Sequence, residues 1–134
     1  MRGEAQRQPA MFHAFNLEDL VPEDHPLREI KRRVDAELRR MSAALNAAYA
    51  NDGRPGVPPE QLIKATLLQA LYSIRSERQL CEQLRYNLLF KWFLDLEPEA
   101  AAWNHSTFSK NRERFARHDL MGAFFRGSVV AAVR

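Results

Sequence analysis

A long apolar stretch from Pro58 to Leu96 limits the possible folds of this chain more than any other part of the sequence. Within 59–72, apolar side chains occupy nearly the whole circumference of a helical wheel, namely Leu62, Ile63, Ala65, Leu67, Leu68, Ala70, Leu71 and Tyr72. A helix that is apolar on every side needs neighbours on every side. We therefore expect a central helix that begins at Pro59, because proline's missing N–H is harmless at the first helical position.

The same stretch predicts two further helices. Ser76 begins the pattern Ser-Glu-Arg-Gln, in which its hydroxyl can accept a hydrogen bond from the backbone N–H of Gln79, so a helix should start there. The outer face of that helix carries three charged residues at spacings that favour ion pairs: Arg78, Glu82 and Arg85. Asn87 can cap a short third helix over 88–94, which is again apolar nearly all round.

The part of the chain before Pro58 predicts an extended segment, a long helix and a loop. Residues 1–25 should be mostly extended, because the prolines at 22 and 26 forbid a helix across 21–26. Over 27–48, apolar residues recur every three or four positions and form one seam, which consists of Leu27, Ile30, Val34, Leu38, Met41, Leu45 and Ala48. The seam could pack on the central helix or on a second copy of the chain, and its short length favours the first. The glycines and prolines of 51–58 predict a loop.

These periodicities, without any convincing two-residue alternation, predict an all-α fold: a bundle of five or six helices. A chain of 134 residues has the size of one domain. We therefore assign 1–25 to an extended N-terminal segment and 26–134 to a single helical domain. The single cysteine, Cys81, excludes an internal disulfide, and charged residues interrupt every apolar run before it could span a membrane. We expect a cytoplasmic protein that makes no membrane contact.

Positive charge is concentrated in two predicted helices. The chain has a formal net charge of +3 and basic residues cluster over 28–40 and 105–117, whereas 18–24 and 95–99 are acidic. Two basic helices separated by acidic loops could orient a polyanion such as nucleic acid, although ordinary solvent-exposed faces would have the same composition.

The helix over 106–117 has the properties of a DNA reader. With Phe108 set inward, Phe115 lies beside it and Arg112 lies nearer the inner side, while the opposite face and its flanks carry Ser106, Thr107, Lys110, Glu113, Arg114 and Arg117. Short hydroxyl residues allow close approach to a groove, and cations reach phosphates and base edges. We predict base contacts from Ser106, Thr107, Lys110 and Asn111, and phosphate contacts from Arg114 and Arg117. The alternative reader is the helix that follows the 73–75 turn, with Arg75 and Arg78.

The C-terminal segment predicts another apolar helix. Only Arg126 and Ser128, besides two glycines, interrupt its run of Leu120, Met121, Ala123, Phe124, Phe125 and Val129 to Val133. Such a helix has more apolar surface than one neighbour can cover. We expect it to pack on a further domain and to promote self-association.

Six stretches of this sequence occur in the order found in a known protein family. They are Leu17-Glu-Asp-Leu-Val-Pro-Glu-Asp-His-Pro-Leu27, Gly53-Arg-Pro-Gly-Val-Pro-Pro-Glu60, Leu67-Leu-Gln-Ala-Leu-Tyr72, Ser76-Glu-Arg-Gln-Leu80, Tyr86-Asn-Leu-Leu-Phe-Lys-Trp-Phe93 and Ser106-Thr-Phe-Ser-Lys-Asn-Arg112. In them, the chain resembles the N-terminal, InsH-like domain of bacterial transposases of the insertion-sequence-five group. The resemblance covers about 12–125.

The resemblance implies a DNA-binding function and assigns catalysis elsewhere. Members of the family carry this helical domain ahead of a ribonuclease-H-like domain, whose three carboxylates bind divalent metal such as magnesium and cut and join DNA at terminal inverted repeats. Because those carboxylates lie downstream, we expect a truncated, non-catalytic chain with no catalytic residue, metal or cofactor of its own. The implied partner is double-stranded DNA, bound through a helix-turn-helix-like unit, although the 94–105 connection is long for a tight one.

Three functions remain open. The first is a DNA-binding domain that recognises terminal inverted repeats. The second is an interaction module that inhibits full-length transposase by pairing with it through the 27–48 seam or the C-terminal helix. The third is a helix-turn-helix repressor, which would bind a palindrome as a homodimer.

Overall fold

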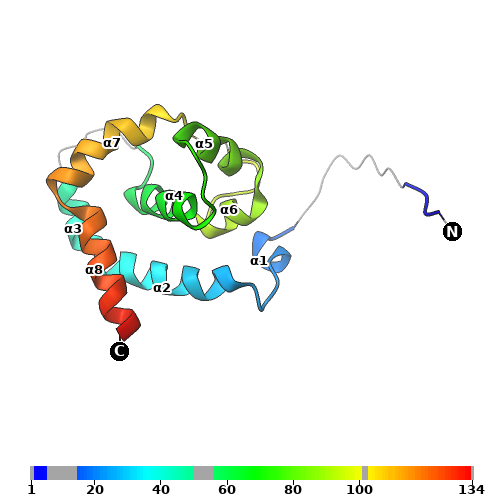
Figure 1. Ribbon diagram of the computed structural model, residues 1–134, viewed down its shortest axis with the longest axis horizontal. Coiled ribbons are helices and arrows are strands. Elements are labelled where there is room, and N and C mark those ends of the chain that lie inside the picture. Colours follow the sequence, from blue (N-terminus) through cyan, green and yellow to red (C-terminus); the bar gives the residue numbers. More distant parts are fainter. Residues whose placement is uncertain (1, 6–14, 50–55, 101–102, 134) are drawn as a thin grey trace.

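The computed structural model describes residues 2–5, 15–49, 56–100 and 103–133, with the backbone alone described over 128–133. The described residues form eight helices and no strand, which confirms the all-α prediction: α1 (Leu17–Leu20), α2 (Pro26–Arg40), α3 (Ser42–Ala48), α4 (Pro59–Leu71), α5 (Glu77–Tyr86), α6 (Leu88–Phe93), α7 (Ser106–Arg117) and α8 (Leu120–Val133) (Figure 1).

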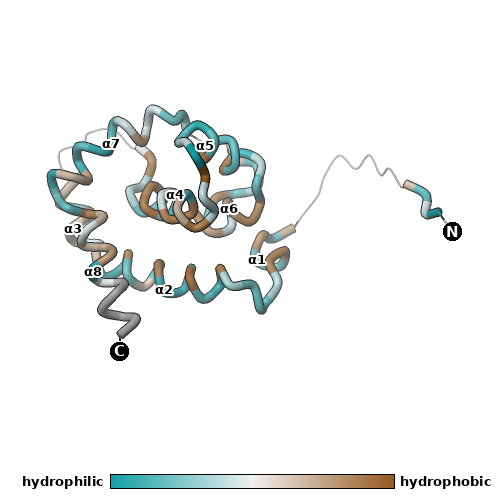
Figure 2. Tube along the Cα trace, in the orientation of Figure 1, coloured by the Kyte–Doolittle hydropathy of each residue, from teal (hydrophilic) through white to brown (hydrophobic). Residues whose placement is uncertain are grey.

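Helix α4 lies in the middle of the bundle, as its sequence predicts. Figure 1 shows α2 along one side of it and α5, α6 and α7 around the rest. Four of its apolar side chains are fully buried: Leu62, Ile63, Ala65 and Leu68. Figure 2 shows hydrophobic segments gathered on α4 and α6, whereas α5 and α7 are largely hydrophilic. The last turn of α4 is different, because Leu71 and Tyr72 are nearly half exposed.

The first half of the chain contains two more helices than the sequence predicts. In the segment expected to be extended, the Asn16 side chain accepts a hydrogen bond from the N–H of Glu18 and starts the single turn α1. The long helix expected over 27–48 is divided at Met41, where ψ is 3°. Hydrogen bonds continue across this break, from Met41 to Glu37 and from Leu45 to Met41, so the apolar period runs on unchanged. The prediction of one uninterrupted helix is therefore wrong.

The apolar seam of α2 and α3 packs inside the molecule. Its buried members are Leu27, Val34, Leu38, Met41 and Leu45. Because these side chains already lie in the core, the seam is not available to pair with a second chain, and the expectation of intramolecular packing is confirmed.

Helix α2, helix α4 and the end of helix α6 are joined by a ring of alternating charges. Lys31 of α2 lies 2.8 Å from Asp35 and 2.9 Å from Asp95, which follows α6. Lys64 of α4 is paired with the same two carboxylates. The Lys64 side chain is only 4% exposed, and a buried ammonium group needs ion-pair or hydrogen-bond partners. The ring therefore fixes α2, α4 and the end of α6 relative to one another.

A second polar cluster fastens α1 and the following loop to α2 and α6. The Arg28 side chain donates hydrogen bonds to the carbonyls of Glu18, Val21 and Pro22 and is also paired with the Glu18 carboxylate. The indole N–H of Trp92 donates to the same carboxylate at 2.7 Å. The hydrogen bonds that Trp92 and Arg28 donate to the Glu18 carboxylate lower the pKa of Glu18.

Helix α8 packs against α2 and α7 through its first half. Leu120 and Phe124 are buried, whereas Phe125 is 47% exposed. At Gly127, α8 approaches α2 so closely that a Cβ atom at this position would overlap the Glu37 carboxylate. Part of the apolar surface predicted to need another domain is thus covered within this chain, and the side chains of 128–134 lie outside the described residues.

Replacing Asp95 by asparagine should make the stability of the fold less sensitive to acid. Burial alone would raise the pKa of Asp95, but the hydrogen bond from Lys31 and the charges of Lys64 and Lys31 outweigh it and lower this pKa. A lowered folded-state pKa stabilises the fold above the unfolded value of about 4, and this stabilisation disappears as the pH falls through the folded value. Asparagine also tolerates the positive φ of 58° at this position.

Urea unfolding at neutral and acidic pH measures this difference. The unaltered protein should lose more stability on acidification than the Asp95→Asn variant. The control is Glu97→Gln, which removes a neighbouring exposed carboxylate. Equal acid sensitivity of the Asp95→Asn variant and the unaltered protein would show that the ring does not act in this way.

Candidate nucleic-acid interface

Helix α7 is held in place by aromatic side chains on its inner face. Phe108 is 8% exposed and its ring lies 5.8 Å from that of Trp103, while Phe115 is half-buried. At its start, the Asn104 side chain accepts a hydrogen bond from the backbone N–H of Ser106. The predicted inward direction of α7 is therefore confirmed.

The outer face of α7 presents two of the predicted DNA-binding cations to solvent. Lys110 and Arg117 are exposed, and Glu113 lies between them. Arg117 pairs with Glu113 at 2.8 Å, although both side chains remain largely exposed, at 67% and 81%. The exposed Arg117–Glu113 pair contributes little to stability and leaves Arg117 able to contact another anion. Ser106 and Thr107 are half-buried at the start of the helix.

Two other predicted DNA-binding residues lie on the flank of α7 that faces α3. Asn111 accepts a hydrogen bond from the hydroxyl of Tyr49 at 2.8 Å and donates one to the carbonyl of Thr107 at 2.8 Å. The Arg114 guanidinium lies over the Tyr49 ring, with its central carbon 4.3 Å from the ring centre. The helical wheel placed Arg114 toward solvent, whereas in the structure Arg114 is half-buried because Tyr49, which follows α3, lies against that flank.

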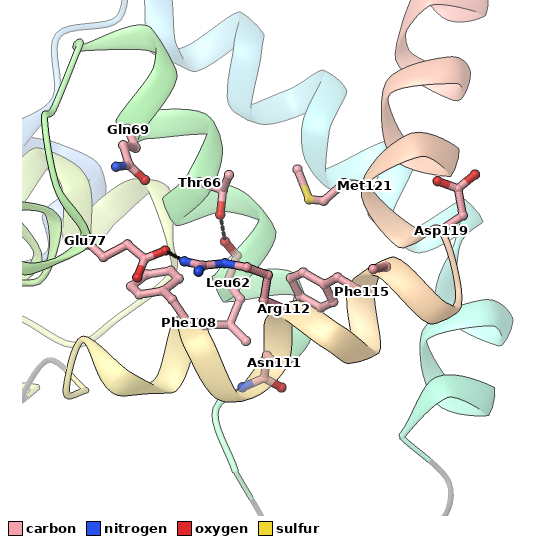
Figure 3. A pocket seen from close by; sticks show the side chains of 11 residues that line it. Leu62, Thr66, Gln69, Glu77, Phe108, Asn111, Arg112, Phe115, Asp119 and Met121 are labelled. Atoms are coloured by element: carbon pink, nitrogen blue, oxygen red, sulfur yellow. Dashed lines mark hydrogen bonds and ion pairs between the residues drawn. The ribbon is translucent and has the colours of Figure 1, made fainter.

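Arg112 connects α7 to α5. It reaches across the gap between the two helices and pairs with Glu77 in the first turn of α5 (Figure 3). The pair lies beside a hollow of about 330 Å³, whose lining includes Leu62, Phe108 and Phe115. The ion pair joins the start of α5 to the middle of α7.

The alternative reader, α5, also presents cations to solvent. Arg75 and Arg78 are both exposed. The ion pairs predicted among Arg78, Glu82 and Arg85 do not form in the described part of the chain, where Arg85 instead lies over the ring of Tyr86 at 5.8 Å. The spacing that favours such pairs does not produce them here. Arg78 and Arg85 therefore remain exposed without an ion pair to Glu82.

The other basic helix, α2, differs because most of its charge is neutralised. Five of the six basic residues in 28–40 make ion pairs: Arg28, Lys31, Arg32, Arg33 and Arg40. Hydrogen bonds from Arg32 and Arg33 lower the pKa of Glu29 to about 2. Of the two basic helices in the sequence, α7 is thus the better candidate to bind a polyanion.

The described residues give little support for a metal site, a reactive cysteine or a membrane-spanning helix. Within the described residues, no group of three or more histidine, cysteine or acidic side chains lies close enough to hold a metal ion. Burial and the charge of Glu77 raise the pKa of Cys81, which disfavours a reactive thiolate. None of the helices is, over its described length, both long and apolar enough to cross a membrane.

Sequence reasoning did not identify Tyr49 or Glu77 as parts of this surface. Tyr49 lies 62 positions before Asn111, and Glu77 lies 35 positions before Arg112. Helical periodicity describes only one helix at a time, so neither contact could be found in this way. The sequence indicated this contact only through the position of Tyr49, an aromatic residue directly after the apolar seam.

The fold and the surface define an all-helical domain with two exposed basic faces joined by an ion pair. The family model described as Transposase domain (DUF772) matches residues 15–114, so the chain belongs to this family of transposase domains. No curated protein and no solved structure matches the chain.

The two faces of α7 should respond differently to substitution. Phe108→Ala should destabilise the protein by about 3 to 5 kcal/mol, because it removes a buried aromatic ring and leaves a cavity. Lys110→Ala, on the exposed face of the same helix, should change the free energy of unfolding by less than about 0.5 kcal/mol. Urea unfolding measures both, and a large loss with Lys110→Ala would contradict the assignment of that face to solvent.

Proposed function

We propose that this chain is the DNA-binding domain of a transposase of the insertion-sequence-five group and that it recognises terminal inverted repeats. The family match supports a role in transposition. The observation that favours DNA binding is the contrast in charge: α7 and α5 carry exposed cations and are joined by the Arg112–Glu77 pair, whereas most cations of α2 are held in ion pairs.

In this proposal α7 enters the major groove. Lys110 contacts bases or phosphates, and Ser106 and Thr107, near the helix N-terminus, allow close approach to base edges. Arg117 contacts a phosphate and exchanges its exposed ion pair with Glu113 for it. Arg78 of α5 and Arg75, which lies in the turn before it, contact the neighbouring DNA backbone as part of a helix-turn-helix-like unit. The cutting and joining of DNA, which use a divalent metal, belong to a separate catalytic domain. The helical domain of this chain requires no cofactor for DNA binding.

The interaction-module alternative is weaker than the sequence suggested. Its first route, pairing through the 27–48 seam, is closed because the seam is buried. Its second route, pairing through α8, keeps the support of one observation. The exposed ring of Phe125 borders a hollow of about 170 Å³ that is lined by Ile30, Val34, Leu67 and Phe124.

Alanine variants and fluorescence anisotropy test the proposal. The probe is duplex DNA enriched by the chain from a random-sequence library, measured at several salt concentrations. Lys110→Ala and Arg117→Ala should each weaken binding, and each lost phosphate contact should reduce the salt slope by about one. Loss of a base contact should instead cost about 1 to 3 kcal/mol at one position of the site.

Arg32→Ala is a matched control for Arg117→Ala. Both arginines pair with a glutamate on their own helix, and their side chains are 69% and 67% exposed. Arg32→Ala should leave the affinity and the salt slope unchanged. If Arg32→Ala weakens binding as much as Arg117→Ala, the polyanion does not select α7. If only Arg78→Ala weakens it, the reader is α5.

A further inference from the structure

Helix α7 has a single acidic residue, Glu113, and it lies among the cations of the outer face. At about 100° per residue, Glu113 lies about 60° from Lys110 and about 40° from Arg117 around the helix axis. The Glu113 side chain is 81% exposed, and its carboxylate accepts a hydrogen bond from Arg117 at 2.8 Å. The face of α7 that would approach DNA therefore carries a carboxylate near its middle.

The phosphate contact proposed for Arg117 removes the partner of Glu113. Once Arg117 binds a phosphate, the Glu113 carboxylate needs another hydrogen-bond donor, because a desolvated carboxylate without one is strongly unfavourable. Lys110 is already assigned to the DNA in the same proposal. DNA phosphates cannot supply the donor, since they only accept hydrogen bonds and carry the same sign of charge. The new donor must therefore come from a base edge.

Cytosine is the base whose major-groove edge fits a carboxylate best. Guanine presents two acceptors there, thymine an acceptor and a methyl group, and adenine an acceptor beside its amino group. Cytosine presents its 4-amino group without an adjacent acceptor of its own, and an ionised carboxylate only accepts. Along the helix axis, Glu113 lies about 4.5 Å beyond Lys110. Stacked base pairs are about 3.4 Å apart, so two side chains at this separation can contact neighbouring pairs.

We propose that Glu113 determines part of the sequence specificity, by accepting a hydrogen bond from the 4-amino group of a cytosine beside the base pair that Lys110 contacts. This inference rests on the proposed function of α7. At any other base, the carboxylate faces an acceptor or a phosphate and opposes binding. The same residue therefore lowers the affinity of the chain for DNA that lacks the cytosine.

Glu113→Ala and the enriched duplex test the inference. The variant removes the acceptor, and it should keep the fold because the exposed pair with Arg117 contributes little to stability; urea unfolding checks this. The unaltered chain should enrich a site with one fixed cytosine and should bind about 5-fold or more weakly when another base replaces it. Glu113→Ala should lose this discrimination, and its affinity for DNA without the cytosine should rise.

A base analogue and a matched variant make the test specific. In the enriched duplex, the cytosine is replaced by the analogue that lacks only the 4-amino group. This change should weaken binding by the unaltered chain more than binding by Glu113→Ala, because only the unaltered chain uses that group. The matched control is Glu29→Ala, which removes a glutamate on α2 that is 54% exposed and paired with arginine. It should keep the fixed cytosine and the discrimination.

Three results would overturn the inference. The first is an enriched site without a fixed cytosine, and the second is a Glu113→Ala variant that discriminates at every position as the unaltered chain does. The third is an equal gain in affinity of Glu113→Ala for all sequences, which would show that Glu113 only repels phosphates. If Lys110→Ala and Arg117→Ala weaken binding in these cases, the proposed function of α7 stands without this inference. If neither of them weakens binding, both fail.

Discussion

The structure depends on the pairing of one buried ammonium group. Lys64 lies in the otherwise apolar central helix, and it is tolerated there because Asp35 of α2 and Asp95 after α6 both bind it. Removal of a charge from water costs several kcal/mol, so these carboxylates must remain in place for α4 to be buried. Lys31 joins the same two carboxylates and completes the ring. The central helix is thus oriented by its one buried cation.

This internal pairing also determines where charge remains on the outside. Because α2 uses Lys31 within the ring and Arg28 to fasten α1, and because Arg32, Arg33 and Arg40 are paired with glutamates, it presents little net charge. Helices α5 and α7 are joined once, through Arg112 and Glu77. Lys110 and Arg78 remain exposed on them, and Arg117 is exposed although it pairs with Glu113. Two helices of similar composition therefore have different surfaces.

Helical periodicity predicted the fold class, the central helix, the burial of the seam and the inner face of α7. It missed α1 and the break at Met41, because a four-residue turn has no period and hydrogen bonds continue across the break. It correctly placed Lys110 and Arg117 on the outside, but it could not show that Tyr49 contacts Asn111 and Arg114 on the flank of the same helix. Composition alone likewise could not separate α2 from α7. Within α2, Arg32, Arg33 and Arg40 pair with glutamates three or four positions away, whereas the pairs of Arg28 with Glu18 and of Lys31 with Asp95 depend on the packing.

Backbone amide hydrogen exchange with and without the enriched duplex tests the central claim most directly, because it reports on every helix at once. The account predicts that DNA slows exchange over 106–117 and around 75–78, with no change over 28–40. Protection over 28–40 without any over 106–117 would contradict it, since the paired charges of α2 would then bind the polyanion in place of the exposed cations of α7.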